Sequence, residues 1–192
     1  FGHPADMTNI MPLAEHYGLK IIEDAAQSPG AMFQGKHVGA LSDVGGFSFN
    51  YHKHIHCGEG GVIVTNSNVI AKRARLLRNH AENFSSNDLF INTTALGYNF
   101  RMTELHAAIG ESQLTRLSSF LSHRNELHQI LVINLSDQPL IRLPRVADWA
   151  THSFYVYPIL LNVSLAKFSR EQLIDRVNFH FGVGEKWEQI PL

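Results

Sequence analysis

The stretch 6-DMTNIMPLAEHYGLKIIED-24 decides the fold class. Its first part predicts a helix over residues 6–18, because Asp6 or Thr8 can cap its start and Gly18 can end it. The segment 19-LKIIED-24 is a short apolar run that ends in two carboxylates, which is typical of a buried parallel strand. A helix, a strand and then polar residues indicate a doubly wound α/β fold, in which ligands bind at the carboxyl ends of strands.

The rest of the chain predicts more of this pattern and a second domain. We expect strands at 46–50, 61–66 and 152–161, helices at 67–81 and 168–182, and one long helix at about 102–135. Residues 137–144 indicate a linker, because their two prolines cannot continue a helix. The expected organisation is therefore a large α/β domain over residues 1–135, with a mostly parallel sheet and the long connecting helix. The start of a small α+β domain, truncated at its end, follows over residues 136–192.

Composition excludes several classes of protein. The 192 residues are 44% hydrophobic, enough for a core, and the net charge of -1 gives no sign of a nucleic-acid partner. No apolar run approaches the ~18 residues that a membrane span needs. A single cysteine excludes an internal disulfide and favours a cytoplasmic protein. The chain begins without Met and stops just after a patterned segment, so we expect it to be a piece of a longer protein.

The stretch 47-FSFNYHKHIHCGEGG-61 contains candidates for two kinds of site. If residues 47–57 formed one strand, His52, His54 and His56 would share a face and two of them could bind zinc, with Cys57 as a further candidate. Three collinear ligands do not easily complete a tetrahedron, however, and no carboxylate-rich partner segment is evident. The histidines are more simply explained as the lining of a cleft.

Lys53 is the other candidate. It follows an apolar strand and lies in a turn between His52 and His54, where a lysine in a cleft could attack a carbonyl carbon. Asp24, at the end of the predicted strand, suits a permanent negative charge such as one that holds a pyridinium nitrogen protonated. Ser48 offers a hydroxyl group to a phosphate. These residues favour a lysine-centred site over a metal site.

Four motifs in order carry a resemblance to a known family. They are 21-IIEDAAQSPGA-31, 47-FSFNYHKHIHCGEGGVIVTN-66, 78-RNHAE-82 and 97-GYNFRMTELHAAIGESQL-114. Together they resemble the DegT/DnrJ/EryC1/StrS family of pyridoxal-phosphate (PLP) sugar aminotransferases of fold type I. The resemblance runs from residue 1 to about 135 and continues more weakly beyond.

The resemblance implies a role for each candidate residue. Lys53 resembles the lysine that holds PLP covalently and moves the proton between the amino-donor carbon and C4′ of the cofactor. Asp24 resembles the aspartate that pairs with the pyridine nitrogen, and Gln27 the residue beside the ring near its 3-hydroxyl group. Ser48 resembles the phosphate-binding serine. Asn99 resembles the asparagine that reaches the cofactor phosphate of the neighbouring subunit, which implies a homodimer with shared sites.

The resemblance also implies a reaction. Relatives that remove a sugar hydroxyl carry histidine in place of this lysine, so Lys53 favours transfer of an amino group from glutamate or glutamine to a nucleotide-linked keto-sugar, in amino-sugar or surface-polysaccharide biosynthesis. The family's N-terminal phosphate loop and ring-stacking residue have no counterpart here, so the 192 residues alone are expected to be inactive. Two alternatives stay open: an incomplete fragment with a scaffold or regulatory role, and a histidine-rich metal-binding protein.

Overall fold

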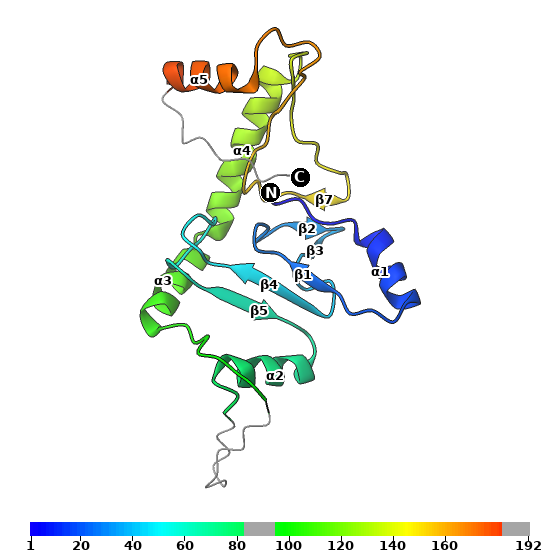
Figure 1. Cartoon of the computed structure of the whole chain (residues 1–192), viewed down its shortest axis with the longest axis vertical. Helices are drawn as coiled ribbons and strands as arrows, with labels where there is room; N and C mark the ends of the chain where they lie inside the picture. Colours follow the sequence, from blue (N-terminus) through cyan, green and yellow to red (C-terminus); the bar gives the residue numbers. More distant parts are fainter. Residues whose placement is uncertain (83–94, 182–192) are drawn as a thin grey trace. The chain divides into compact units, whose positions relative to one another are not determined.

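The computed structural model describes residues 1–82 and 95–181 (Figure 1). The elements in chain order are α1 (Met7–His16), β1 (Ile22–Asp24), β2 (Met32–Phe33), β3 (Lys36–His37), β4 (Val44–Ser48), β5 (Gly61–Val64), α2 (Asn68–Arg78), α3 (Glu104–Leu114), α4 (Leu117–Leu135), β6 (Ile141–Arg142), β7 (Ala150–Thr151), β8 (Leu160–Leu161) and α5 (Arg170–Phe181). The chain forms two compact units. The first contains residues 1–128 and 145–157, and the second contains residues 129–144 and the chain from residue 158 onward.

A three-stranded sheet in the order β1-β4-β5 carries two of the predicted site residues, Asp24 and Ser48. β1 is parallel to β4, with Asp24 opposite Gly46, and β5 is antiparallel to β4, with Ser48 opposite Gly61. The carboxyl ends of β1 and β4 therefore lie at the same edge of the sheet, as the doubly wound pattern predicts. The predicted burial of β1 is wrong for this chain: Ile22 is 77% exposed, because β1 has a neighbouring strand on one side only.

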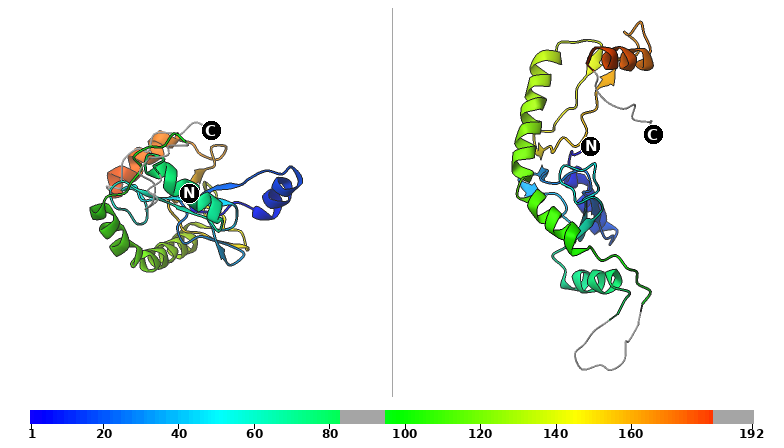
Figure 2. Two further views of the ribbon diagram at one scale, coloured as in Figure 1. Left: turned by 90° about the horizontal axis from the view of Figure 1, so that it is seen from below. Right: turned by 90° about the vertical axis from the view of Figure 1, so that its left-hand side faces the viewer.

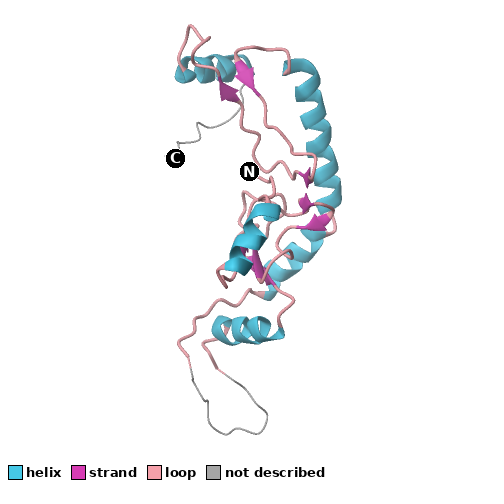
Figure 3. Ribbon diagram, turned by 90° about the vertical axis from the view of Figure 1, so that its right-hand side faces the viewer, coloured by secondary structure: helices cyan, strands magenta, loops and turns pink. Residues whose placement is uncertain are grey.

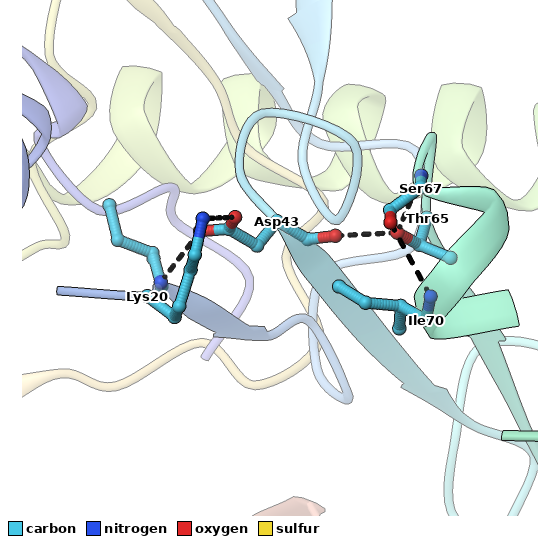
Figure 4. Close-up of polar contacts among 6 residues, drawn as sticks. Lys20, Asp43, Thr65, Ser67 and Ile70 are labelled. Carbon is cyan, nitrogen blue, oxygen red and sulfur yellow. Dashed lines mark hydrogen bonds and ion pairs between the residues drawn. The ribbon is translucent and has the colours of Figure 1, made fainter. Parts of the chain in front are cut away.

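Polar contacts join this sheet to the helix that follows it (Figure 4). Asp43 accepts hydrogen bonds from Lys20 Nζ at 2.8 Å and from the backbone N–H of Ile21 at 3.0 Å, and its carbonyl oxygen accepts one from Thr65 Oγ1 at 2.6 Å. Thr65 Oγ1 in turn accepts from the backbone N–H of Ser67 at 3.1 Å. Ser67 is the N-cap of α2 and accepts from the N–H of Ile70 at 3.4 Å. The start of α2 is thereby fixed relative to β4.

The predicted long helix at about 102–135 is interrupted in the structure. α3 ends at Leu114, α4 begins at Leu117, and α4 belongs to the first unit only up to His128. At the break, Thr115 Oγ1 donates to the carbonyl oxygen of Ser112 at 2.8 Å, which competes with the helical backbone bonds. The prediction of one continuous helix is therefore wrong.

α3 packs against the turn that precedes β5 (Figure 2). A β-carbon on Gly110 of α3 would lie 3.8 Å from Cys57 Cβ, and one on Gly58 would lie 3.9 Å from His106 Nε2. The side chain of Cys57 is buried there. Both distances are ordinary van der Waals contacts, so the helix lies directly against the turn.

Residues 145–157 return to the first unit and complete a second small sheet. β7 pairs antiparallel with β2, with Phe33 opposite Ala150, in the order β3-β2-β7. The predicted strand at 152–161 forms only at its end, as β8. Phe154 has a φ of 48°, a left-handed conformation that a strand does not contain, and Pro158 has no N–H to donate.

The second unit contains β6, β8 and α5 (Figure 3). β6 lies inside the segment predicted as a linker and pairs antiparallel with β8. Ser169 and Gln172 form a reciprocal capping box at the start of α5, with bonds of 3.2 and 2.8 Å. Among the helices of residues 1–82 and 95–181, none combines the length and apolar character needed to cross a membrane.

Candidate active site

A turn built around Asn50 presents Lys53 just beyond the end of β4. The carbonyl oxygen of Asn50 accepts from the N–H of Lys53 at 2.9 Å, and its side-chain oxygen accepts from the N–H of His52 at 3.2 Å. The Asn50 side-chain amide donates to Glu59 Oε1 at 2.7 Å. Lys53 is half-buried in this turn. Sequence reasoning did not identify Asn50, although an asparagine directly after a strand is a common turn signal.

Asp24 and Ser48 lie on one face of the β1–β4 pair. Residues in register on parallel strands share a face, and so do residues two apart on one strand, so Gly46 links Asp24 to Ser48. A β-carbon on Gly46 would meet no atom within 4 Å, so this face is open between the two side chains. Asp24 is exposed and accepts from the N–H of Ala26 at 3.1 Å. The burial expected for the end of this strand is therefore not found at Asp24 in this chain.

Glu23, the neighbour of Asp24, points to the other face and organises a loop. Its carboxylate accepts from the N–H groups of Gly39, Leu41 and Ser42 at 2.7, 2.8 and 3.0 Å, and from Ser42 Oγ at 2.9 Å. This loop leads directly into β4. The two adjacent carboxylates of β1 therefore have different tasks: Glu23 holds the scaffold and Asp24 faces the candidate site.

The returning segment 145–157 forms one side of the lysine turn. His54 is buried, and its Nε2–H donates to the carbonyl oxygen of Ser153 at 2.7 Å. Ser153 Oγ donates to the carbonyl oxygen of Gln27 at 3.3 Å. Tyr155 covers Lys53, with 4.7 Å from Nζ to the ring centroid. Sequence reasoning missed Ser153 and Tyr155; the aromatic run 152-HSFYVYP-158 was the available signal.

Burial keeps His54 uncharged. The pKa of His54 is lowered from its ordinary value of 6.5 to about 4, mainly by desolvation. The hydrogen bond to Ser153 opposes this change, and the positive charges of Arg124 and Lys53 contribute to it. The other ring nitrogen, Nδ1, is buried and has no hydrogen-bond partner among the described residues. The side chain beside Lys53 is therefore a neutral imidazole near pH 7.

The other residues of the proposed metal cluster point to different surroundings. β4 ends at Ser48, so residues 47–57 are not one strand. His56 is exposed, the ring of His52 stacks on that of Tyr51 with centroids 3.8 Å apart, and Cys57 is buried. Within residues 1–82 and 95–181, no three His, Cys, Asp or Glu side chains form a group that could hold a metal ion.

Asn99 lies apart from the other four predicted residues. It is exposed and forms an isolated antiparallel bridge with Asn79 at the end of α2. Its neighbours Tyr98 and Phe100 are also exposed, with stacked rings 5.2 Å apart. In the part of the chain that the structure describes, no hydrogen bond connects Asn99 with Asp24, Gln27, Ser48 or Lys53.

Cavities lie beside β1 and along α2 in the first unit. One of about 300 Å³ is lined by Asp24 and Ala25 at the end of β1 and by His3 and Ser28, among others. The other, of about 660 Å³, runs along α2 and includes none of the predicted site residues in its lining. Of the five predicted site residues, Asp24 is the one that lines either of these cavities.

Known sugar aminotransferases resemble the chain in sequence and in structure. The chain is 37% identical to the GDP-perosamine synthase of Caulobacter vibrioides over 180 residues, covering 91% of this chain and 46% of that protein. It is 39% identical to the dTDP-3-amino-3,4,6-trideoxy-alpha-D-glucose transaminase of Streptomyces venezuelae over 160 residues, covering 81% and 41%. The crystal structure of S. venezuelae DesV in complex with a ketimine intermediate matches with a TM-score of 0.83 and 32% identity, covering 94% and 46%.

These relatives confirm the predicted fold class, that of fold type I aminotransferases. The chain spans about half the length of the curated relatives it matches. A family model, the DegT/DnrJ/EryC1/StrS aminotransferase family, matches residues 1–187. The chain therefore belongs to the DegT/DnrJ/EryC1/StrS aminotransferase family.

Proposed function

We propose that the protein containing this chain is a PLP-dependent aminotransferase that moves an amino group from glutamate or glutamine to a nucleotide-linked keto-sugar. The observation that carries the proposal is Lys53, half-buried in the turn after β4 of a chain that belongs to an aminotransferase family. A lysine amine can bond to the carbonyl carbon of PLP. The GDP-linked and dTDP-linked products in the names of two relatives support a nucleotide-linked substrate.

The open face between Asp24 and Ser48 supports PLP as the cofactor. A carboxylate, an unfilled space at Gly46 and a hydroxyl group follow one another there, and they fit a ring nitrogen, a flat ring and a phosphate. When bound, PLP acts as an electron sink. In this proposal Asp24 keeps the ring nitrogen protonated, Gln27 contacts the 3-hydroxyl side, Ser48 binds the phosphate and Lys53 moves the proton between the amino-donor carbon and C4′.

We assign Asn99 to the site of a second copy in a homodimer. Its exposed side chain and the exposed rings of Tyr98 and Phe100 support a surface that a partner covers. Under this proposal each site draws Lys53 from one subunit and Asn99 from the other. The cofactor-binding domain would extend over residues 1–135, and the small domain would begin at residue 136.

The assignment of Lys53 is tested by covalent labelling. The protein is expressed from its complete coding sequence, incubated with PLP, reduced with borohydride and mapped by peptide mass spectrometry. We expect the pyridoxyl group on Lys53 and bleaching of the cofactor absorbance when glutamate is added to unreduced protein. Lys36→Ala, at an exposed lysine of β3, is the matched control and should retain both results. A Lys53→Ala protein that still transfers the amino group would refute the assignment.

Mixing two inactive variants tests the shared site. Lys53→Ala and Asn99→Ala subunits are unfolded together and refolded, so that mixed dimers form. A mixed dimer has one site with both substitutions and one site with neither, so activity should reappear at about a quarter of the native value if variants pair at random. Recovery of none would mean that Lys53 and Asn99 act within one subunit.

A further inference from the structure

The ring of Tyr155 contacts the Lys53 ammonium in this structure. Lys53 Nζ lies 4.7 Å from the centroid of the Tyr155 ring, a distance at which the negative face of an aromatic ring attracts a cation. No carboxylate lies within ion-pair distance of Lys53 in the described part of the chain, residues 1–82 and 95–181. Arg124, which like Lys53 lowers the pKa of the adjoining His54, is positive. The ring is thus the attractive surface available to this ammonium.

The backbone on both sides holds the ring in place. The N–H of Tyr155 donates to the carbonyl oxygen of Phe1 at 3.0 Å, and Arg124 Nη1 donates to the carbonyl oxygens of Phe154 and Tyr155 at 2.7 and 3.2 Å. The ring also packs against the neutral His54 ring, with centroids 5.6 Å apart. A ring fixed in this way requires no rearrangement to receive the ammonium.

We propose that the Tyr155 ring is the resting position of the Lys53 side chain whenever the lysine is not bonded to the cofactor. The inference rests on the proposed function, in which Lys53 is bonded to PLP at one stage and free at another. A free lysine on a four-carbon chain would otherwise sample many rotamers in solvent. Held over the ring, it stays beside the place where it must next transfer a proton. The Tyr155 ring would act on the reaction through the Lys53 side chain, so it is a positioning residue.

Three substitutions distinguish the ring from the hydroxyl group. Tyr155→Phe keeps the ring, Tyr155→Leu removes it and Tyr155→Trp provides a stronger cation-binding face. The readout is the acylation rate of Lys53 by an amine-reactive ester in cofactor-free protein, mapped by mass spectrometry with Lys36 as internal reference. We expect Tyr155→Leu to raise the Lys53 rate about two- to fivefold, Tyr155→Phe to leave it near the native rate and Tyr155→Trp to lower it.

Activity supplies a second readout. Tyr155→Leu should lower kcat and leave KM for glutamate near the native value, and Tyr155→Phe should retain both. Equal Lys53 acylation rates in the native, Leu and Trp proteins would overturn the proposal, and so would a Phe variant that behaves like Leu. If borohydride fixes PLP on Lys53 while the Leu variant acylates at the native rate, the proposed function stands and the resting position fails. If the acylation rate of Lys53 depends on the ring at position 155 but PLP does not attach to Lys53, the proposed function is refuted and the resting position stands.

Discussion

Removal of the Glu23 carboxylate tests whether this residue holds the scaffold of the site. Glu23→Ala deletes four hydrogen bonds and leaves the N–H groups of Gly39, Leu41 and Ser42 without their acceptor. A hydrogen bond to a charged group contributes ~1.5–3 kcal/mol. The four share one carboxylate and the freed loop can rehydrate, so they do not add fully. We expect the free energy of unfolding to fall by about 3–5 kcal/mol, a large part of the stability of a typical domain.

The assay is urea unfolding combined with amide hydrogen exchange. Glu23→Gln keeps one acceptor oxygen but turns an NH₂ group toward a donor, so it should cost about 1.5–3 kcal/mol. Glu15→Ala removes an exposed carboxylate of α1 and should stay within about 0.5 kcal/mol of the native protein. The amides of Gly39, Leu41 and Ser42 should exchange faster in Glu23→Ala. A loss below about 1 kcal/mol, or amides that remain protected, would refute the reasoning.

Three further results are expected. Gly45→Ala should destabilise the protein by about 3 kcal/mol or more in urea unfolding, because the added methyl group would overlap the backbone of Gly39. Gly46→Ala should cost about 1 kcal/mol or less and should weaken PLP binding in fluorescence titration. Equal losses of stability in the two variants would contradict this description of the packing. Since the folded pKa of His54 lies below its unfolded value of 6.5, this histidine's contribution to stability is complete above pH 6.5 and is lost as the pH falls toward about 4. The urea midpoint should therefore fall as the pH is lowered from 6.5 toward 4, and His54→Gln should make the midpoint depend less on pH. If the pH profile of the variant equals that of the native protein, His54 is not the cause of the loss of stability. Ser67→Ala should cost ~1 kcal/mol at the start of α2, measured by the same unfolding, and no loss would mean that water replaces the cap.

Local patterns were sufficient to predict the parts of the fold that local forces determine. Asp6 caps α1 as expected, and Asp24 and Ser48 end neighbouring strands because each follows an apolar run. The break at Thr115 was not predictable from periodicity, since the apolar spacing continues through it. The side-chain hydrogen bond from Thr115 to Ser112 leaves no signal in that spacing. Glu23 was equally hidden, because its partners are backbone N–H groups, which every sequence has.

The side of the site formed by residues 145–157 could not be predicted for another reason. β2 and β7 are two residues long each, so neither carries a recognisable alternation. The bond from His54 to Ser153 joins residues 99 positions apart, and it depends on a tertiary fold that brings a carbonyl oxygen to a buried imidazole. Tyr155 was visible only as one member of an aromatic run. Its place over Lys53 follows from the return of the chain.

That return has a consequence for synthesis of the protein. Gln27 and His54 both form hydrogen bonds with Ser153, which follows them by 126 and 99 positions in the chain. At roughly 5–20 residues per second, a ribosome needs about 5–20 s to make the hundred residues between the lysine turn and Ser153. During that interval His54, buried in the finished structure, lacks its partner Ser153, and Lys53 lacks the ring of Tyr155. The nascent chain therefore passes through a stage in which the lysine turn is synthesised but one of its sides is missing.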